Sequence, residues 1–178
     1  MRKLRNKELN RLSVEEFKET EKTPVIAILD NVRSLNNVGS VFRTSDALCL
    51  EEIYLCGITP TPPHNDIHKT ALGAEDSMNW SYHEDTNKSV VDLQAEGYKV
   101  YCVEQARGST SLLDFKPQIN EKIALVFGNE VKGVQQAVID SSDGCIEIPQ
   151  FGTKHSLNIS VSAGIVLWEA AKWIRGLV

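Results

Sequence analysis

The sequence predicts an α/β fold in which a mostly parallel β-sheet carries helices on both faces. Residues 25–29 and 123–127 are continuous apolar runs, as expected of strands that are buried on both sides. From residue 23 onward, strand-like and helix-like segments alternate, which is the pattern of parallel strands joined by crossover helices. Periodicity alone suggests an ordinary Rossmann-like order of strands, and general topological rules argue against a knot.

The chain is expected to divide at residue 23. Residues 1–22 are predicted to form a basic, helical extension that Thr23-Pro24 ends, and residues 23–178 form the main domain. We expect strands at 25–29, 53–56, 80–83, 98–103, 123–127 and 145–148. Between them we expect a helix from near Asn37 to about Leu48, a short helix around 69–74, and a helix that ends at Glu96 and is capped by Asp85 or Thr86. A last helix is expected from about 158 to 175.

Turn residues separate these elements. Gly57 closes the second strand, and the proline-rich stretch 59–66 that follows must be a loop. Gly97 is placed to be the C′ residue of the helix that ends at Glu96, since glycine adopts the left-handed conformation without strain.

The last predicted helix is apolar around much of its circumference. Its two stripes are Val161, Ile165 and Trp168 on one side, and Ala163, Val166, Ala170 and Ile174 on the other. Such a helix needs burial on more than one side. One face can cover the sheet, and the other predicts a homodimer contact.

Length and composition indicate one globular domain. The chain has 178 residues, of which 42% are hydrophobic and 24% charged, so it can bury a core of its own. No apolar run approaches the roughly 20 residues that a membrane-spanning helix requires. The charged N-terminus has no apolar stretch after it and is not expected to be a signal peptide. A cytoplasmic protein without a membrane segment is therefore expected.

Charge is distributed unevenly along the chain. The net charge is −5, yet residues 1–11 carry a local balance of +4, which leaves −9 on the rest. A basic arm can bind phosphates while an acidic body keeps the protein soluble. A solvated terminal helix is the alternative interpretation.

Neither cysteine nor histidine indicates a metal site. The sequence has no C-x-x-C pair, and we expect Cys49, Cys56, Cys102 and Cys145 to be buried, reduced thiols. His64, His68, His83 and His155 lack the spacing of a metal pair on one helical turn beside a glutamate, so loop or surface positions are expected. His155 is the one that we expect beside the site.

Three polar segments follow apolar runs and predict a ligand crevice. They are residues 36–43, 127–130 and 148–158. In an open α/β sheet, loops at the carboxyl ends of strands gather at one edge and bind ligands there. The chain has no G-x-G-x-x-G loop and no P-loop lysine, which disfavours binding of nicotinamide dinucleotides and nucleoside triphosphates.

Each segment alone also has a purely structural interpretation. Asn36, Asn37 or Ser34 would serve as a helix cap, and Ser156 or Asn158 would cap the last helix. Glu130 would pair with Arg43 or Lys132. Arg43 stands out because apolar neighbours place it near a buried face, where arginine needs an anion such as phosphate.

Taken together, the three segments resemble the motifs of the SpoU (TrmH-type) RNA ribose 2′-O-methyltransferases of the SPOUT superfamily. The matching patterns are Asn-x5-Arg, Gly-x-Glu and Ser-Leu-Asn, in this order, and the resemblance covers about residues 23–175. It implies a C-terminal deep trefoil knot, S-adenosylmethionine bound in that knot without a metal, and a homodimer that packs partly through the last helix.

The resemblance also implies roles for individual residues. The catalytic set is Asn37, Arg43, Glu130, Ser156 and Asn158, and the cofactor-binding set is Glu104, Gly128, Asn129, Ile148, Ser156 and Leu157. We expect Gly128 to allow close approach of the ligand to the backbone. The family position of Glu104 varies in residue type.

The implied reaction is in-line attack of a ribose 2′-oxygen on the sulfonium methyl group. Arg43 is either the general base or, as we prefer, an electrostatic clamp, because neutral guanidinium is costly. A transfer RNA is the favoured substrate and ribosomal RNA the second choice. An RNA-binding module without catalysis and a knotted guanine-base methyltransferase remain the alternatives.

Overall fold

A parallel sheet of seven strands forms the centre of the molecule. The computed structural model describes residues 1–5 and 8–178. The strands are β1 (Thr23–Asp30), β2 (Leu50–Cys56), β3 (Trp80–His83), β4 (Lys99–Val103), β5 (Thr110–Ser111), β6 (Ile123–Phe127) and β7 (Gly144–Glu147). Their order is β3-β2-β1-β6-β4-β7-β5, and all neighbouring pairs run parallel. The predicted fold class is confirmed.

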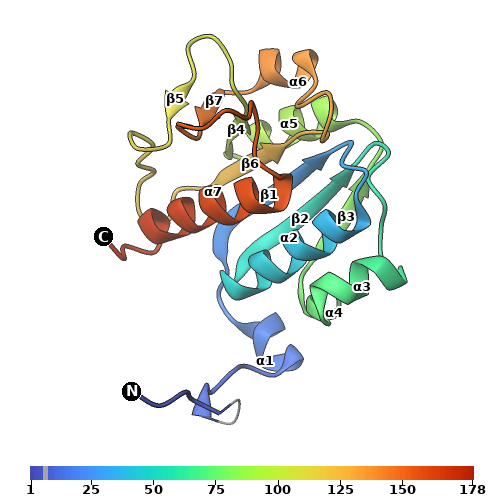
Figure 1. The fold of residues 1–178 in the computed structure, drawn as a ribbon, viewed down its shortest axis with the longest axis vertical. Helices are drawn as coiled ribbons and strands as arrows, with labels where there is room; N and C mark the ends of the chain where they lie inside the picture. The colour runs from blue at the N-terminus through green and yellow to red at the C-terminus, as the bar shows by residue number, and fades with distance from the viewer. Residues whose placement is uncertain (6–7) are drawn as a thin grey trace.

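Helices cover both faces of this sheet (Figure 1). The helices of the described residues are α1 (Val14–Glu19), α2 (Leu35–Ala47), α3 (Asn65–Ala71), α4 (Ala74–Ser77), α5 (Thr86–Ala95), α6 (Gln136–Ser141) and α7 (Ile159–Ile174). In β1, Ala27 and Leu29 pack into a core with α1 to α4 and α7, whereas Ile26 and Ile28 pack into a second core with α5 and α6. This two-sided burial explains the continuous apolar run of β1.

Several predicted boundaries move. The helix expected to begin near Asn37 begins at Leu35, because the Ser34 side chain accepts a hydrogen bond from the Asn37 N–H at 3.3 Å and caps it. The single helix expected around 69–74 was wrong. The chain forms α3 and α4 instead, separated by Leu72 and Gly73 in the left-handed conformation.

Two short elements were not predicted. Strand β5 has only two residues, which is too few for a periodic signal. Helix α6 has six residues, and its N-cap Gln135 makes no side-chain capping bond. Both lacked the local signals on which sequence reasoning depends.

The N-terminal extension is less helical than expected. Among the described residues of the extension, only Val14–Glu19 is α-helical, and this helix begins with a capping box between Ser13 and Glu16. Phe17 is buried against the first core. Lys7, one of the basic residues counted in the arm, lies outside the described residues.

The last helix has the two faces that its sequence predicts. Ala163, Val166, Ala170 and Ile174 are fully buried against the rest of the chain. Val161, Ile165 and Trp168 remain 49%, 39% and 55% exposed. Within the described residues, no helix has the length and apolarity required to cross a bilayer.

All four cysteines are free thiols. Cys56 and Cys102 are buried as predicted, but Cys49 and Cys145 are only half-buried. Burial raises the pKa of the Cys56 thiol to about 12, so this group stays protonated at neutral pH.

The register of the central strands aligns their carboxyl ends. Phe127 lies beside both Leu29 of β1 and Val103 of β4, and Val103 lies beside Ile146 of β7. The loops that follow these strands therefore leave the sheet at one edge. The deep trefoil knot implied by the resemblance stays a prediction.

Candidate active site

A cavity of about 720 Å³ opens at the carboxyl edge of the sheet. Its walls come from the residues that follow β4, β6 and β7 and from the start of α7. This volume lies in the range of small-molecule sites. The lining residues include all six predicted to bind the cofactor, namely Glu104, Gly128, Asn129, Ile148, Ser156 and Leu157.

The residues predicted to be catalytic do not all meet there. Glu130, Ser156 and Asn158 line the cavity, whereas Asn37 adjoins it through a hydrogen bond from its Nδ2 to Glu130 Oε1 at 3.2 Å. Arg43 is not among the lining residues, and its side chain is exposed on α2. The expectation that Arg43 lies near a buried face was wrong for its side chain, although Val41 and Phe42 are fully buried.

Gly128 is required by the packing of its own loop. A Cβ atom at this position would lie 2.2 Å from the carbonyl carbon of Gly133 and 2.2 Å from the nitrogen of Val134. The sequence suggested that glycine leaves room for a ligand. In the structure, the backbone that comes so close is that of the chain itself, in the segment 128–135, which we call the β6–α6 loop.

Glu104 holds the far end of the β6–α6 loop. Its Oε2 accepts a hydrogen bond from the Val134 N–H at 3.1 Å, and its Oε1 accepts one from the Gln105 N–H at 2.9 Å. A Cβ on Gly133, whose φ is +68°, would lie 2.2 Å from Glu104 Oε2. The carboxylate therefore joins the end of β4 to the far end of the β6–α6 loop at the cavity wall.

Glu130 joins the second polar segment to the start of α2. Its carboxylate accepts hydrogen bonds from the Arg33 N–H at 3.1 Å, the Ser34 N–H at 3.0 Å and the Asn37 amide. Partial burial acts to raise the pKa of Glu130, but these donors outweigh it, and the pKa lies below its ordinary value. These contacts replace the pairing with Arg43 or Lys132 that the sequence suggested.

The third segment ends in a helix cap. Asn158 Oδ1 accepts a hydrogen bond from the Ser160 N–H at 2.9 Å, so Asn158 rather than Ser156 is the N-cap of α7. The side chains of Ser156 and Leu157 are therefore not engaged in capping. His155 also lines the cavity, as the sequence suggested, and its carbonyl accepts from Gln105 Nε2 at 2.6 Å.

Sequence reasoning missed part of the cavity and its support. The unpredicted lining residues include Val103, Gln105, Lys132, Gly133 and Ser162. Asp30 and Asn31, which accept hydrogen bonds from the two ends of the β6–α6 loop, were also missed. Their position immediately after the apolar run of β1 was the available signal, because polar residues at strand ends face the ligand edge.

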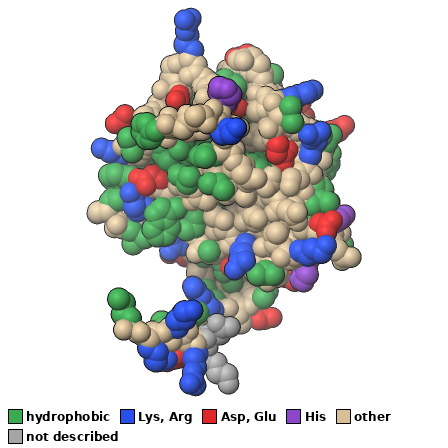
Figure 2. Space-filling model, viewed as in Figure 1, with side chains coloured by type: hydrophobic (Ala, Val, Ile, Leu, Met, Phe, Trp, Pro, Cys, Tyr) green, Lys and Arg blue, Asp and Glu red, His purple; other side chains and the backbone are tan. Residues whose placement is uncertain are grey.

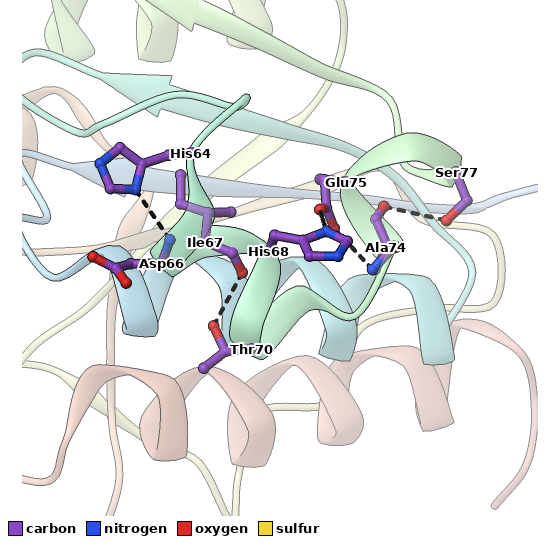
Figure 3. A network of polar contacts seen from close by, with 9 residues as sticks. His64, Asp66, Ile67, His68, Thr70, Ala74, Glu75 and Ser77 are labelled. Carbon is purple, nitrogen blue, oxygen red and sulfur yellow. Dashed lines mark hydrogen bonds and ion pairs between the residues drawn. The ribbon is translucent and has the colours of Figure 1, made fainter.

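A second cavity, of about 540 Å³, contains two of the histidines. His64 Nδ1 accepts a hydrogen bond from the Asp66 N–H at 3.1 Å and caps α3, while His68 Nδ1 lies 2.5 Å from Glu75 Oε1 (Figure 3). Both are committed to local contacts, as expected of loop and surface histidines. The described residues contain no cluster of histidine, cysteine and acidic side chains suited to a metal ion.

Comparison with known proteins gives consistent matches to this arrangement. The model of the SpoU rRNA Methylase family matches residues 24–168. The tRNA (guanosine(18)-2′-O)-methyltransferase of Thermus thermophilus is 29% identical over 168 residues, which cover 93% of this chain and 83% of that protein.

Solved structures match as well. The TrmH/SpoU tRNA modifying enzyme of A. aeolicus superposes with a TM-score of 0.79 at 23% identity, covering 92% of this chain and 83% of the other. The AdoMet-bound rRNA methyltransferase of Sinorhizobium meliloti gives a TM-score of 0.79 at 25% identity over 88% of this chain. This chain spans only 59% of the S. meliloti protein.

Proposed function

The chain belongs to the SpoU family of RNA 2′-O-methyltransferases, and we propose that its substrate is a transfer RNA. Its reaction is the transfer of a methyl group from S-adenosylmethionine to a ribose 2′-hydroxyl. The structural observation that supports this reaction is the cavity at the carboxyl edge, which is lined by residues of the second and third family motifs.

The charged side chains of the cavity favour a ligand that carries a positive charge. Glu104 and Glu130 line it against a single lysine, Lys132, so acidic side chains outnumber basic ones. Val103, Ile148 and Leu157 offer apolar surface, as an adenine ring requires. When bound, the cofactor supplies an electrophilic methyl group on a sulfonium.

We propose that Arg43 and Asn37 act on the RNA rather than on the cofactor. Glu130, which lines the cavity, accepts a hydrogen bond from the Asn37 amide. The guanidinium of Arg43 would stabilise charge on the 2′-oxygen or the adjacent phosphate, since electrostatic stabilisation needs no proton exchange. Proton removal by Arg43 is disfavoured because a neutral guanidinium is costly at ordinary pH. Loss of the 2′-hydroxyl proton to water or a neighbouring group is the alternative that we favour.

The basic arm supports the choice of RNA. Arg2, Lys3 and Arg5 are exposed, and Figure 2 shows basic side chains gathered on the arm below the main body. Cationic side chains bind the phosphate backbone of any RNA, and the acidic body confines this attraction to one end. We favour transfer RNA because the Thermus relative is a tRNA methyltransferase and the match covers most of both proteins. Ribosomal RNA is the second candidate, because the S. meliloti protein is an rRNA methyltransferase. An RNA substrate of either kind favours a cytoplasmic location.

The substrate proposal is tested with labelled S-adenosylmethionine and purified RNA. We expect transfer of the label to tRNA in preference to ribosomal RNA, and recovery of a 2′-O-methylnucleoside after nuclease digestion. Label only in ribosomal RNA would overturn the tRNA assignment. A methylated base would support the guanine-base alternative, and RNA binding without any transfer would support a non-catalytic module.

We further propose that two copies assemble through the exposed stripe of α7, which consists of Val161, Ile165 and Trp168. Figure 2 shows hydrophobic side chains gathered over this part of the molecule. Helix α7 packs against α2, so a partner seated on the stripe would lie beside the helix that carries Arg43. In this arrangement, the exposed Arg43 would contribute to an RNA-binding site formed by both copies.

Replacing Trp168 by glutamate should convert dimers to monomers at micromolar concentration, because a buried charge without a partner disfavours the interface. Light scattering measures the change. Val91→Glu is the matched control, since Val91 is 52% exposed on α5, on the opposite face of the sheet, and should leave the dimer intact. A wild-type protein that is already monomeric at this concentration would contradict the assembly.

A further inference from the structure

A buried carboxylate lies beneath the cavity without contributing to its lining. Asp30, the last residue of β1, is 0% exposed. Its Oδ1 accepts hydrogen bonds from Thr86 Oγ1 at 2.7 Å, Gln135 Nε2 at 2.8 Å and Asn31 Nδ2 at 2.8 Å, and its Oδ2 accepts from the Gln135 N–H at 3.0 Å. Four donors compensate for the burial of one acidic group.

Two of these donors belong to one residue at the end of the β6–α6 loop. Gln135 donates both its backbone N–H and its side-chain amide to Asp30. The start of the same loop is held by the next residue of the chain, because the Asn31 carbonyl accepts from Asn129 Nδ2 at 2.7 Å. Consecutive residues after β1 thus hold both ends of a loop that lies about 100 positions further along the sequence.

The residues between these two anchors form one wall of the cavity. Residues 128–134 all line it, whereas Asp30 and Asn31 do not. Within the loop, Asn129 and Gly133 exchange backbone hydrogen bonds at 3.0 and 2.9 Å, which keeps it tightly turned. Moving Gln135 would therefore displace a compact unit rather than a single side chain.

We propose that Asp30 is a positioning residue for the cofactor, acting through Gln135 to fix the β6–α6 loop as the wall of the binding cavity. The inference rests on the proposed function, in which this cavity holds S-adenosylmethionine. Asp30 touches neither cofactor nor RNA in this scheme. Its loss should weaken cofactor binding and leave the chemical step nearly unchanged once the site is filled.

The principal test is Asp30→Asn. This change keeps the shape of the side chain, but it replaces one carboxylate oxygen, a hydrogen-bond acceptor, by an NH2 group that would face the donors around residue 30. We expect the Kd for S-adenosylmethionine and the KM for it to rise at least about tenfold, since hydrogen bonds to a charged group are lost. The kcat at saturating cofactor should stay within about threefold of wild type, as for a change in ground-state binding. A folded Asp30→Asn protein with wild-type Kd would overturn the proposal.

A matched control separates the contact of Asp30 with the loop from its contact with α5. Thr86→Val removes the hydroxyl that ties Asp30 to α5 but leaves both Gln135 donors in place. It should lower the melting temperature without changing the Kd for the cofactor. If Thr86→Val weakens binding as much as Asp30→Asn, Asp30 acts through general stability and the positioning role is wrong.

A second variant adds a rescue. In Asp30→Asn with Gln135→Glu, the new amide of residue 30 can donate to the new carboxylate, so part of the lost affinity should return.

If Asp30→Asn does not fold, Gln135→Leu replaces it as the test. Gln135→Leu removes only the side-chain donor and should raise the KM for the cofactor with little change in kcat. Unchanged KM in Gln135→Leu would count against the proposal.

Hydrogen exchange keeps this test independent of the proposed function. The amide protons of Val134 and Gln135 should exchange faster in Asp30→Asn than in the wild type, in the absence of any cofactor. If the wild type does not bind S-adenosylmethionine in calorimetry, the proposed function fails while the exchange result still decides whether Asp30 holds the loop. Equal exchange in both proteins would refute the role of Asp30 in holding the loop.

Discussion

Replacing Arg43 by alanine should slow methyl transfer at least about a hundredfold, the usual cost of removing one preorganised electrostatic contact. Binding of S-adenosylmethionine should be unchanged, because Arg43 is exposed on α2 and does not line the cavity. Single-turnover transfer to RNA measures the first quantity, and calorimetry without RNA measures the second. Arg43→Lys should recover little activity, because a point charge does not reproduce the planar donor fork.

Lys88→Ala is the control for the loss of one surface cation. Lys88 lies on α5, which covers the opposite face of the sheet from α2. Its removal should leave transfer near the wild-type rate. If Arg43→Ala turns over normally, or if its defect disappears at saturating cofactor, Arg43 has no role in the chemical step.

Replacing Gly128 by alanine should abolish measurable binding of S-adenosylmethionine. The added Cβ would lie 2.2 Å from backbone atoms of Gly133 and Val134, and backbone cannot move aside as a flexible side chain can. The β6–α6 loop must therefore shift, and the wall of the cavity shifts with it. Calorimetric titration measures the binding, and thermal unfolding should show a lower Tm as well.

Gly144→Ala is the matched control for this prediction. Gly144 begins β7 at the amino end of the strand, and a Cβ there would lie 3.5 Å from Tyr101, an ordinary contact. This variant should bind the cofactor like the wild type. Wild-type affinity in Gly128→Ala would show that cofactor binding does not depend on the position of this loop.

Local sequence patterns were sufficient for the fold class and for the edge of the sheet at which the cavity opens. The apolar runs at 25–29 and 123–127 are strands β1 and β6, because burial on both faces leaves no room for polar alternation. Polar segments after such runs lie at the ligand edge, and Glu104, Gly128 and Leu157, which the family resemblance assigned to the cofactor, line the cavity there. The two stripes of α7 were likewise correct, since helical periodicity is a property of neighbouring residues.

Features that depend on distant segments were decided only by the tertiary structure. Sequence alone could not show that Asp30 meets Gln135, 105 positions away, or that Gly128 is crowded by its own loop. It also placed Arg43 near a buried face, whereas the structure exposes it. These contacts arise from the register between β1, β6 and β4, which brings their carboxyl ends together. Periodicity determines which residues a strand buries, but the approach of two loops depends on which strands are neighbours, and no local pattern encodes that choice.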